Sequence, residues 1–182
     1  FKGNGHTISD LTITGQYSPA GLFGIVEEQG SIESLSVRGV VSVSDSADTT
    51  TGGIVGINHG TLINCQFTGV VTGDSEVGGI VGRNESEGTI DHSTARAIVT
   101  GKSSTGGIAG YNLGAITGCT NVGSINTEYP EASLDTDGFT AKMVDYINNK
   151  MAAAADDATN SVTNVATDTG GIAGRSSGMI LT

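Results

Sequence analysis

The five residues Gly-Gly-Ile-Val-Gly at positions 78–82 decide the fold, because four other segments of the chain repeat them closely. The same five residues stand at 52–56, Gly-Gly-Ile-Ala-Gly stands at 106–110 and 170–174, and the related Ala-Gly-Leu-Phe-Gly stands at 20–24. These segments, here called glycine boxes, begin 32, 26, 28 and 64 residues apart along the chain. Self-similarity at such a period is typical of solenoids, in which equivalent coils stack on one another.

Two further segments recur after each glycine box. The first starts with Gly and carries an aliphatic residue two positions later; these residues are Ile32, Leu62, Ile90, Ile116 and Ile180. The second is a short run rich in β-branched residues, at 40–43, 70–72, 98–100 and, more weakly, 122–125. Such runs are too short for helices and have the composition of strands. The start of the chain fits the same pattern if Ile8 takes the place of Ile32.

Strands that follow one another in one direction, with only short loops between them, pair with their own copies one coil away. The chain is therefore predicted to be all-β, as a three-sided parallel β-helix, and right-handed because parallel crossovers almost always are. Successive coils lie one inter-strand spacing apart, ~4.8 Å. One column of aliphatic side chains should point into the core; it comprises Ile8, Ile32, Leu62, Ile90, Ile116 and Ile180.

The corners of the solenoid have their own signals. Paired Gly residues allow a positive φ or a close approach of two backbones. Asn58, Asn84 and Asn112 each stand two residues after the closing Gly of their box. Asn tolerates the left-handed conformation, and stacked amides can hydrogen-bond along the rod. We expect an asparagine ladder; a row of Asn residues that binds a ligand is the alternative.

These residues resemble a known family. The glycine boxes and the opening sequence Phe-Lys-Gly-Asn-Gly-His-Thr-Ile are similar to the GLUG repeats of bacterial surface proteins, over most of the chain except residues 127–169. The resemblance implies an extracellular or cell-surface location in bacteria. It also implies a place in adhesin-like proteins or in the non-catalytic region of IgA-specific metallopeptidases. It carries no catalytic residue to this chain.

The charge of the chain excludes some partners. The formal net charge is −11 and the pI is near 4.4. Nucleic acids need a basic surface, and anionic membranes attract basic segments, so neither is expected to bind. No run reaches the ~18 apolar residues of a membrane span. Because the sequence opens and closes within a repeat, we expect a piece of a longer protein. The exposed edges of its end coils could associate end to end.

Cysteine and histidine give no metal or redox motif. Cys65 and Cys119 occupy the same place two coils apart, ~9–10 Å along the stack by strand spacing. A disulfide needs Cα atoms within ~7 Å, so two free, largely buried thiols are expected. His6, His59 and His92 have no helical His partner four residues away and form no column. No cofactor is expected.

Acidic loops are the one candidate metal site. Asp45, Asp48, Asp74 and Glu76 follow the third strands of neighbouring coils and should share one corner. Four carboxylates could begin a Ca²⁺ site, although Ca²⁺ takes six or more oxygen ligands. The repeat pattern of calcium-binding β-rolls is absent, so solvated carboxylates are the preferred interpretation.

Two other activities of solenoid proteins find little support in the sequence. A carbohydrate-active β-helix enzyme would use paired carboxylates, for which Asp10, Asp74 and Asp91 are candidates. No basic cluster accompanies them, and the chain has no Trp to stack on a sugar. An ice-binding surface would need a column of Thr-x-Thr, and only residues 12–14 have this pattern.

Residues 127–169 break the repeat inside what is otherwise a single solenoid over residues 1–182. A helix is predicted near 139–154, because apolar residues recur there at spacings of three and four. Its stripe should pack on the solenoid and is the candidate partner-binding surface; it contains Phe139, Met143, Tyr146, Ile147 and Met151.

The leading functional hypothesis is a non-catalytic structural or adhesive module of a bacterial extracellular or surface protein. The partner would be a host protein or a glycan. The alternatives are a carbohydrate-active β-helix enzyme and an accessory domain of a secreted peptidase. The repeat favours the first hypothesis, because a stack of equivalent coils is foremost a scaffold.

Overall fold

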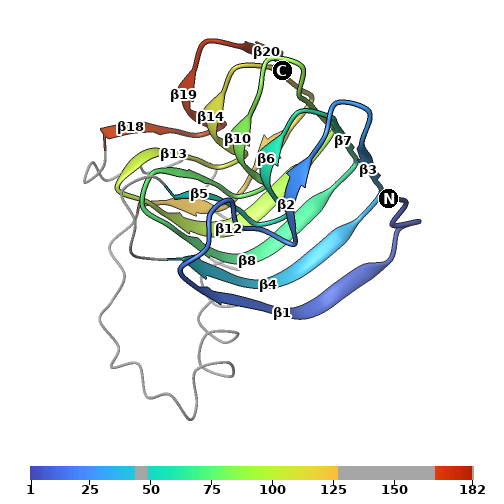
Figure 1. The fold of residues 1–182 in the computed structure, drawn as a ribbon, viewed down its shortest axis with the longest axis horizontal. Coiled ribbons are helices and arrows are strands. Elements are labelled where there is room, and N and C mark those ends of the chain that lie inside the picture. The colour runs from blue at the N-terminus through green and yellow to red at the C-terminus, as the bar shows by residue number, and fades with distance from the viewer. Residues whose placement is uncertain (44–48, 127–166, 182) are drawn as a thin grey trace.

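The computed structural model describes residues 1–43, 49–126 and 167–181, which contain twenty β-strands and no helix. The ladders between these strands are parallel, and each links strands from successive coils (Figure 1). The described part is thus an all-β solenoid of about four turns. It includes no helix long and apolar enough to cross a membrane.

The strands form four sheets, each named here by one of its strands. The β5 sheet contains β5 (Thr50–Gly52), β9 (Glu76–Gly78), β13 (Ser103–Gly106) and β18 (Thr167–Gly170). The β6 sheet contains β2 (Phe23–Val26), β6 (Val55–Asn58), β10 (Val81–Asn84), β14 (Ala109–Asn112) and β19 (Ala173–Ser176). The β7 sheet contains β3 (Ser31–Glu33), β7 (Thr61–Ile63), β11 (Thr89–Asp91), β15 (Ala115–Thr117) and β20 (Met179–Leu181). The β8 sheet contains β1 (Thr7–Gly15), β4 (Ser36–Val43), β8 (Gln66–Thr72), β12 (Thr94–Thr100), β16 (Thr120–Asn121) and β17 (Ser124–Ile125).

The described residues form four sheets, whereas the three-sided solenoid predicted from the sequence would have one sheet on each side. The additional sheet arises because the glycine box belongs to two strands. In one coil β5 ends at Gly52 and β6 begins at Val55, so only two residues separate them. The right-handed sense and the three-sided cross-section stay predictions.

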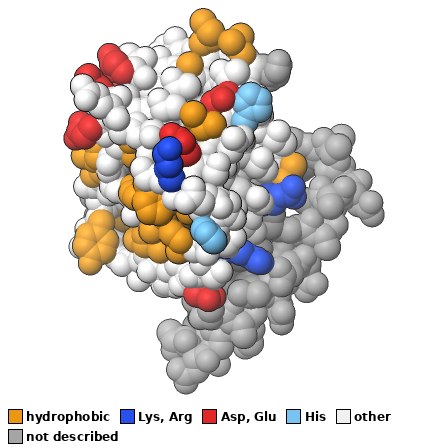
Figure 2. All heavy atoms as spheres, turned by 90° about the vertical axis from the view of Figure 1, so that its right-hand side faces the viewer, with side chains coloured by type: hydrophobic (Ala, Val, Ile, Leu, Met, Phe, Trp, Pro, Cys, Tyr) orange, Lys and Arg blue, Asp and Glu red, His pale blue; other side chains and the backbone are white. Residues whose placement is uncertain are grey.

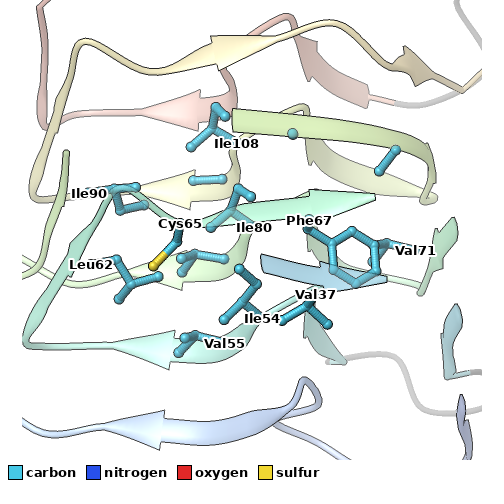
Figure 3. Packing of buried hydrophobic residues seen from close by; sticks show 14 of the residues in the cluster. Val37, Ile54, Val55, Leu62, Cys65, Phe67, Val71, Ile80, Ile90 and Ile108 are labelled. Atoms are coloured by element: carbon cyan, nitrogen blue, oxygen red, sulfur yellow. The ribbon is translucent and has the colours of Figure 1, made fainter. Parts of the chain in front are cut away.

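The predicted aliphatic column exists, except at its first member. Its in-register pairs link β3, β7, β11, β15 and β20; the residues are Ile32, Leu62, Ile90, Ile116 and Ile180. The first four are at most 2% exposed, whereas Ile180 in the last described strand is 38% exposed. Figure 3 shows Leu62 and Ile90 within the packed interior.

The placement of Ile8 was wrong. Ile8 pairs with Val37 in the β8 sheet, and a bridge between Lys2 and Glu33 fills the position on the β7 sheet instead. The apolar spacing at the start of the chain fits either sheet, because a register shift between Ile8 and Leu11 in β1 interrupts the strand alternation.

The glycine boxes serve close backbone approach rather than a positive φ. None of their glycines has φ in the left-handed region. A Cβ on Gly53 would lie 2.5 Å from the Phe67 ring and would meet the Gly79 carbonyl oxygen. A Cβ on Gly79 would in turn meet the Gly107 carbonyl oxygen. Successive boxes therefore stack too closely for a side chain.

The left-handed corner of the solenoid lies elsewhere, just before the β8 sheet. Positive φ values recur there from coil to coil, at Asn4 (50°), Ser34 (51°), Asn64 (52°), His92 (45°) and Gly118 (58°). The residue type changes at each coil, which is why the sequence did not reveal this corner.

Candidate functional site

The asparagine ladder predicted from the sequence is confirmed. Asn58 Nδ2 donates to Asn84 Oδ1 at 2.8 Å, and Asn84 Nδ2 donates to Asn112 Oδ1 at 2.8 Å. All three side chains are 0% exposed. Each amide nitrogen also donates to the carbonyl of a following Gly, at 3.0–3.2 Å. The ladder therefore satisfies buried polar groups internally and offers no accessible amide to a ligand.

The ladder changes residue type at both ends. Val26 pairs in register with Asn58, so the first position is apolar. Ser176 pairs with Asn112, and Asn112 Nδ2 donates to its hydroxyl oxygen at 3.2 Å. Ser176 then donates to the Gly178 carbonyl at 3.3 Å, as the asparagines do to their own glycines.

The two cysteines are free thiols, as predicted. Ser93 lies between them in the column: the Cys65 backbone N–H donates to Ser93 Oγ at 3.1 Å, and the Ser93 backbone N–H donates to Cys119 Sγ at 3.4 Å. Burial raises the pKa of both thiols above the ordinary value. Protonated thiols are poor nucleophiles, so the fold does not activate either cysteine.

The candidate Ca²⁺ ligands are only partly described. Asp45 and Asp48 lie outside the described residues. Asp74 contacts Lys102, with 2.5 Å between its Oδ1 and the lysine Nζ. Glu76 pairs with Arg83 at 2.8 Å and accepts a hydrogen bond from Thr50. Within residues 1–43, 49–126 and 167–181, no group of three His, Cys, Asp or Glu side chains could hold a metal ion.

A stack of aromatic and guanidinium groups on the β6 sheet was not predicted. Arg83, Tyr111 and Arg175 pair in register, and the two guanidinium carbons lie 5.0 and 5.5 Å from the centroid of the tyrosine ring. Arg83 also bonds Glu85 at 2.6 Å. Burial lowers the pKa of Arg83, but the two glutamates outweigh it and the net pKa is raised. The sequence did contain a signal, since each residue directly follows the closing Gly of its box.

The carboxylates considered for glycoside chemistry stand on separate elements. Asp10 is in β1, Asp74 is in the loop before β9, and Asp91 is in β11. Asp91 pairs with His92 Nδ1 at 2.9 Å. The structure therefore does not assemble these three aspartates on one strand or one sheet.

The predicted insertion helix and its apolar residues lie outside the described residues. The structure does not describe residues 44–48, 127–166 and 182, and the predicted helix falls within the second of these ranges. The repeat has resumed by Thr167, where β18 begins, slightly before the boundary at 169 expected from the sequence.

Comparisons with known proteins agree with this architecture. Residues 73–100, which span most of one coil, match the GLUG motif. Halomucin from Haloquadratum walsbyi is 36% identical over 96 residues, which is 52% of this chain and 1% of that protein. No solved structure matches. The chain thus carries a GLUG motif within a β-solenoid and is similar to a very small part of halomucin.

Proposed function

We propose that the chain is a non-catalytic structural module of an extracellular or cell-surface protein, in which it serves as a stalk, spacer or adhesive unit. The observation that carries the proposal is the continuous buried ladder formed by Asn58, Asn84 and Asn112, beside an aliphatic column in the same coils. Such columns couple every coil to the next, so the stack resists bending and stretching along its axis.

The surface location has independent support. Halomucin is named as a mucin, the GLUG repeat resembles segments of bacterial surface proteins, and the chain is strongly acidic. On the face in Figure 2, several hydrophobic side chains gather in one group, and the acidic, basic and His side chains lie apart from one another around it. We infer that the parent protein is secreted or displayed on a cell, with a bacterial origin implied by the GLUG resemblance. An antibody against this chain should label intact producing cells, and labelling only after lysis would contradict this.

The rod that we propose is right-handed and three-sided, with the β5 and β6 sheets sharing one side. Right-handed winding follows from the general preference of parallel crossovers. A shared side is supported by the two-residue separation of β5 from β6. An experimental structure would test both features.

End-to-end association is a further part of the proposal. The last described strand exposes Met179 and Leu181 by 59% and 51%, and Phe1 at the other end is 58% exposed. Open edges with apolar side chains favour stacking of a further coil, from this chain or another. Sedimentation over a range of concentrations would test association, and a monomer at all of them would exclude it.

Force spectroscopy tests the structural role. The chain would be placed between two marker domains of known unfolding force and stretched along its length. We expect discrete unfolding events and a resting length that stays constant below them. Extension like that of an unstructured linker, with no force peak assigned to this chain, would overturn the proposed structural function.

A further inference from the structure

Two arginines on the outer face of the β8 sheet are not used by the fold. Arg38 in β4 and Arg96 in β12 are exposed, and each pairs in register with Thr68 of β8, which lies between them. Their strand neighbours Val37 and Ala95 are 0% exposed, so the alternation of the strands directs the arginines outward. Figure 1 shows β4, β8 and β12 side by side.

These two arginines differ from the other arginines that the structure describes. Arg83 binds two glutamates and stacks on Tyr111, and Arg175 stacks on the same ring. Arg38 and Arg96 make no hydrogen bond, ion pair or ring contact within the described part of the chain. Their five N–H donors each are therefore free for a ligand.

A row of neutral polar side chains runs beside the arginines. Ser36, Gln66 and Thr94 pair in register two residues earlier in the same three strands. They are half-buried, and no hydrogen bond from their side chains occurs in the described structure. The face thus presents hydroxyl and amide groups in one row and guanidinium groups in the next.

The spacing of the arginines selects the kind of ligand. They stand two strands apart, which is ~9–10 Å along the solenoid axis. A guanidinium group binds carboxylate or sulfate through two parallel hydrogen bonds. An extended chain of pyranoses joined through equatorial (β) linkages advances by nearly one strand spacing per sugar. Guanidinium groups on every second strand therefore match acidic groups on every second sugar.

We propose that the outer face of the β8 sheet binds an acidic polysaccharide that carries a carboxylate or sulfate on alternate sugars. The polymer runs along the solenoid axis, with successive acidic groups on Arg38 and Arg96. The intervening sugar lies over Thr68, and sugar hydroxyls bond the row that contains Gln66. This binding activity goes beyond the proposed structural role and does not depend on the stiffness of the rod.

The negative charge around the two arginines opposes binding of an anionic polymer. The chain has a net charge of −11, which repels a polyanion at long range, so affinity must come from the local contacts. Asp10 stands in the irregular part of β1 that lies opposite Arg38, because Ile8 pairs with Val37 and Leu11 pairs with Gly39. Its carboxylate should oppose an anion at the first arginine, and Asp10→Asn should therefore strengthen binding.

Isothermal titration calorimetry with size-defined hyaluronate oligosaccharides tests the proposal, since glucuronate alternates there with a neutral sugar. We expect binding of hyaluronate and no binding of a chitin oligosaccharide of equal length. Arg38→Gln and Arg96→Gln should each weaken binding about tenfold or more, and the double variant should abolish it. Arg175→Gln makes the same change of charge on another sheet and should leave the affinity unchanged.

Three outcomes would overturn the proposal. In the first, Arg175→Gln weakens hyaluronate binding as much as Arg38→Gln and Arg96→Gln do. In the second, the chitin oligosaccharide binds as tightly as hyaluronate. In the third, neither hyaluronate nor chondroitin sulfate oligosaccharides bind. The replaced side chains are exposed, so circular dichroism and thermal midpoints should match those of the unmodified chain. Failure here leaves the proposed structural function standing, because that function is tested by force and not by binding.

Discussion

Asn58 Nδ2 lies 2.8 Å from Asn84 Oδ1, and both side chains are completely buried. Asn84 also donates to Asn112, so it is the central member of the ladder. Asn84→Ala would leave one N–H of the buried Asn58 amide and the buried Asn112 Oδ1 without their ladder partners, at ~1–3 kcal/mol for each unsatisfied group, although Asn58 Nδ2 keeps its bond to the Gly60 carbonyl. We expect a large fall in the free energy of unfolding, measured with urea. Gln66→Ala, which removes an amide from the outer face, should change it little.

Asn84→Asp sharpens the same prediction. Aspartate keeps the shape and the acceptor for Asn58 but cannot donate to Asn112 when ionised. It should destabilise the chain at neutral pH and recover part of the loss in acid, where a protonated carboxyl group donates again. A pH-independent effect would show that the donor direction of the ladder is unimportant.

The aliphatic column predicts a gradient of sensitivity along the stack. Ile90 is 0% exposed and has in-register partners on both sides, Leu62 and Ile116. Ile90→Ala should cost ~2–5 kcal/mol, because a buried truncation loses transfer energy and leaves a cavity. Ile180→Ala should cost clearly less, since that side chain is 38% exposed. Thr89→Ala, on the outward side of the same strand as Ile90, is the matched control, and equal costs for all three would contradict the column.

The glycine boxes give a steric prediction. A Cβ on Gly79 would collide with the Gly107 carbonyl oxygen, and rigid backbone cannot move aside cheaply. A Cβ on Gly24 would meet only the Pro19 carbonyl oxygen, at 3.7 Å, which is ordinary contact. Gly79→Ala should therefore lower the thermal midpoint strongly, whereas Gly24→Ala should leave it nearly unchanged. Similar midpoints for the two variants would remove close approach as the reason for the boxes.

The features that could be predicted from the sequence are those in which the same residue type recurs from coil to coil. Stacking places like on like, so the column through Ile90 and the ladder through Asn84 could be found by aligning the coils. Ile8 was misplaced because its coil carries no glycine box before it, and apolar spacing alone did not distinguish the β7 sheet from the β8 sheet. The division into four sheets was missed because a glycine box does not show where one short strand ends and the next begins.

The sites escaped prediction for a related reason. The stack around Tyr111 and the arginines beside Thr68 occupy equivalent positions, but their residue types differ from coil to coil. Their positions can be read from the register, whereas the contact between a guanidinium group and a ring depends on side-chain rotamers. The repeated residues therefore predict the solenoid fold. The positions where the residue type changes between coils hold the side chains that could bind a ligand, and these are not predicted by the repeat.

The cysteines predict a pH dependence. Cys65 is 1% exposed, and burial raises the pKa of its thiol. The neutral thiol is thus favoured by the fold, and this contribution to stability is complete below the thiol pKa of the unfolded chain. It is lost as pH rises through the higher folded value. Alkylation of Cys65 in the folded chain should be slow at neutral pH, and Cys65→Ser should flatten the alkaline fall in stability.

A thiol titration checks the column that contains these residues. The unfolded, unreduced chain should show two reactive thiols, because Ser93 separates Cys65 from Cys119. An intrachain disulfide detected by mass would show that the coil register is wrong.

Removal of residues 127–166 tests whether the solenoid depends on them. β17 ends at Ile125 beside β12, and β18 resumes pairing with β13 at Thr167, so the described ladders are complete without the removed segment. Joining the ends by a short Gly/Ser link should leave a folded, β-rich chain with the circular dichroism of parallel strands. Loss of that signal would mean that the segment is part of the fold.

The same deletion tests the proposed recognition role of the segment. A host protein or glycan ligand that depends on its apolar stripe should no longer bind after the deletion; the stripe comprises Phe139, Met143, Tyr146, Ile147 and Met151. Binding of hyaluronate through Arg38 and Arg96 should persist. Unchanged binding of every ligand would remove the proposed recognition role of the segment.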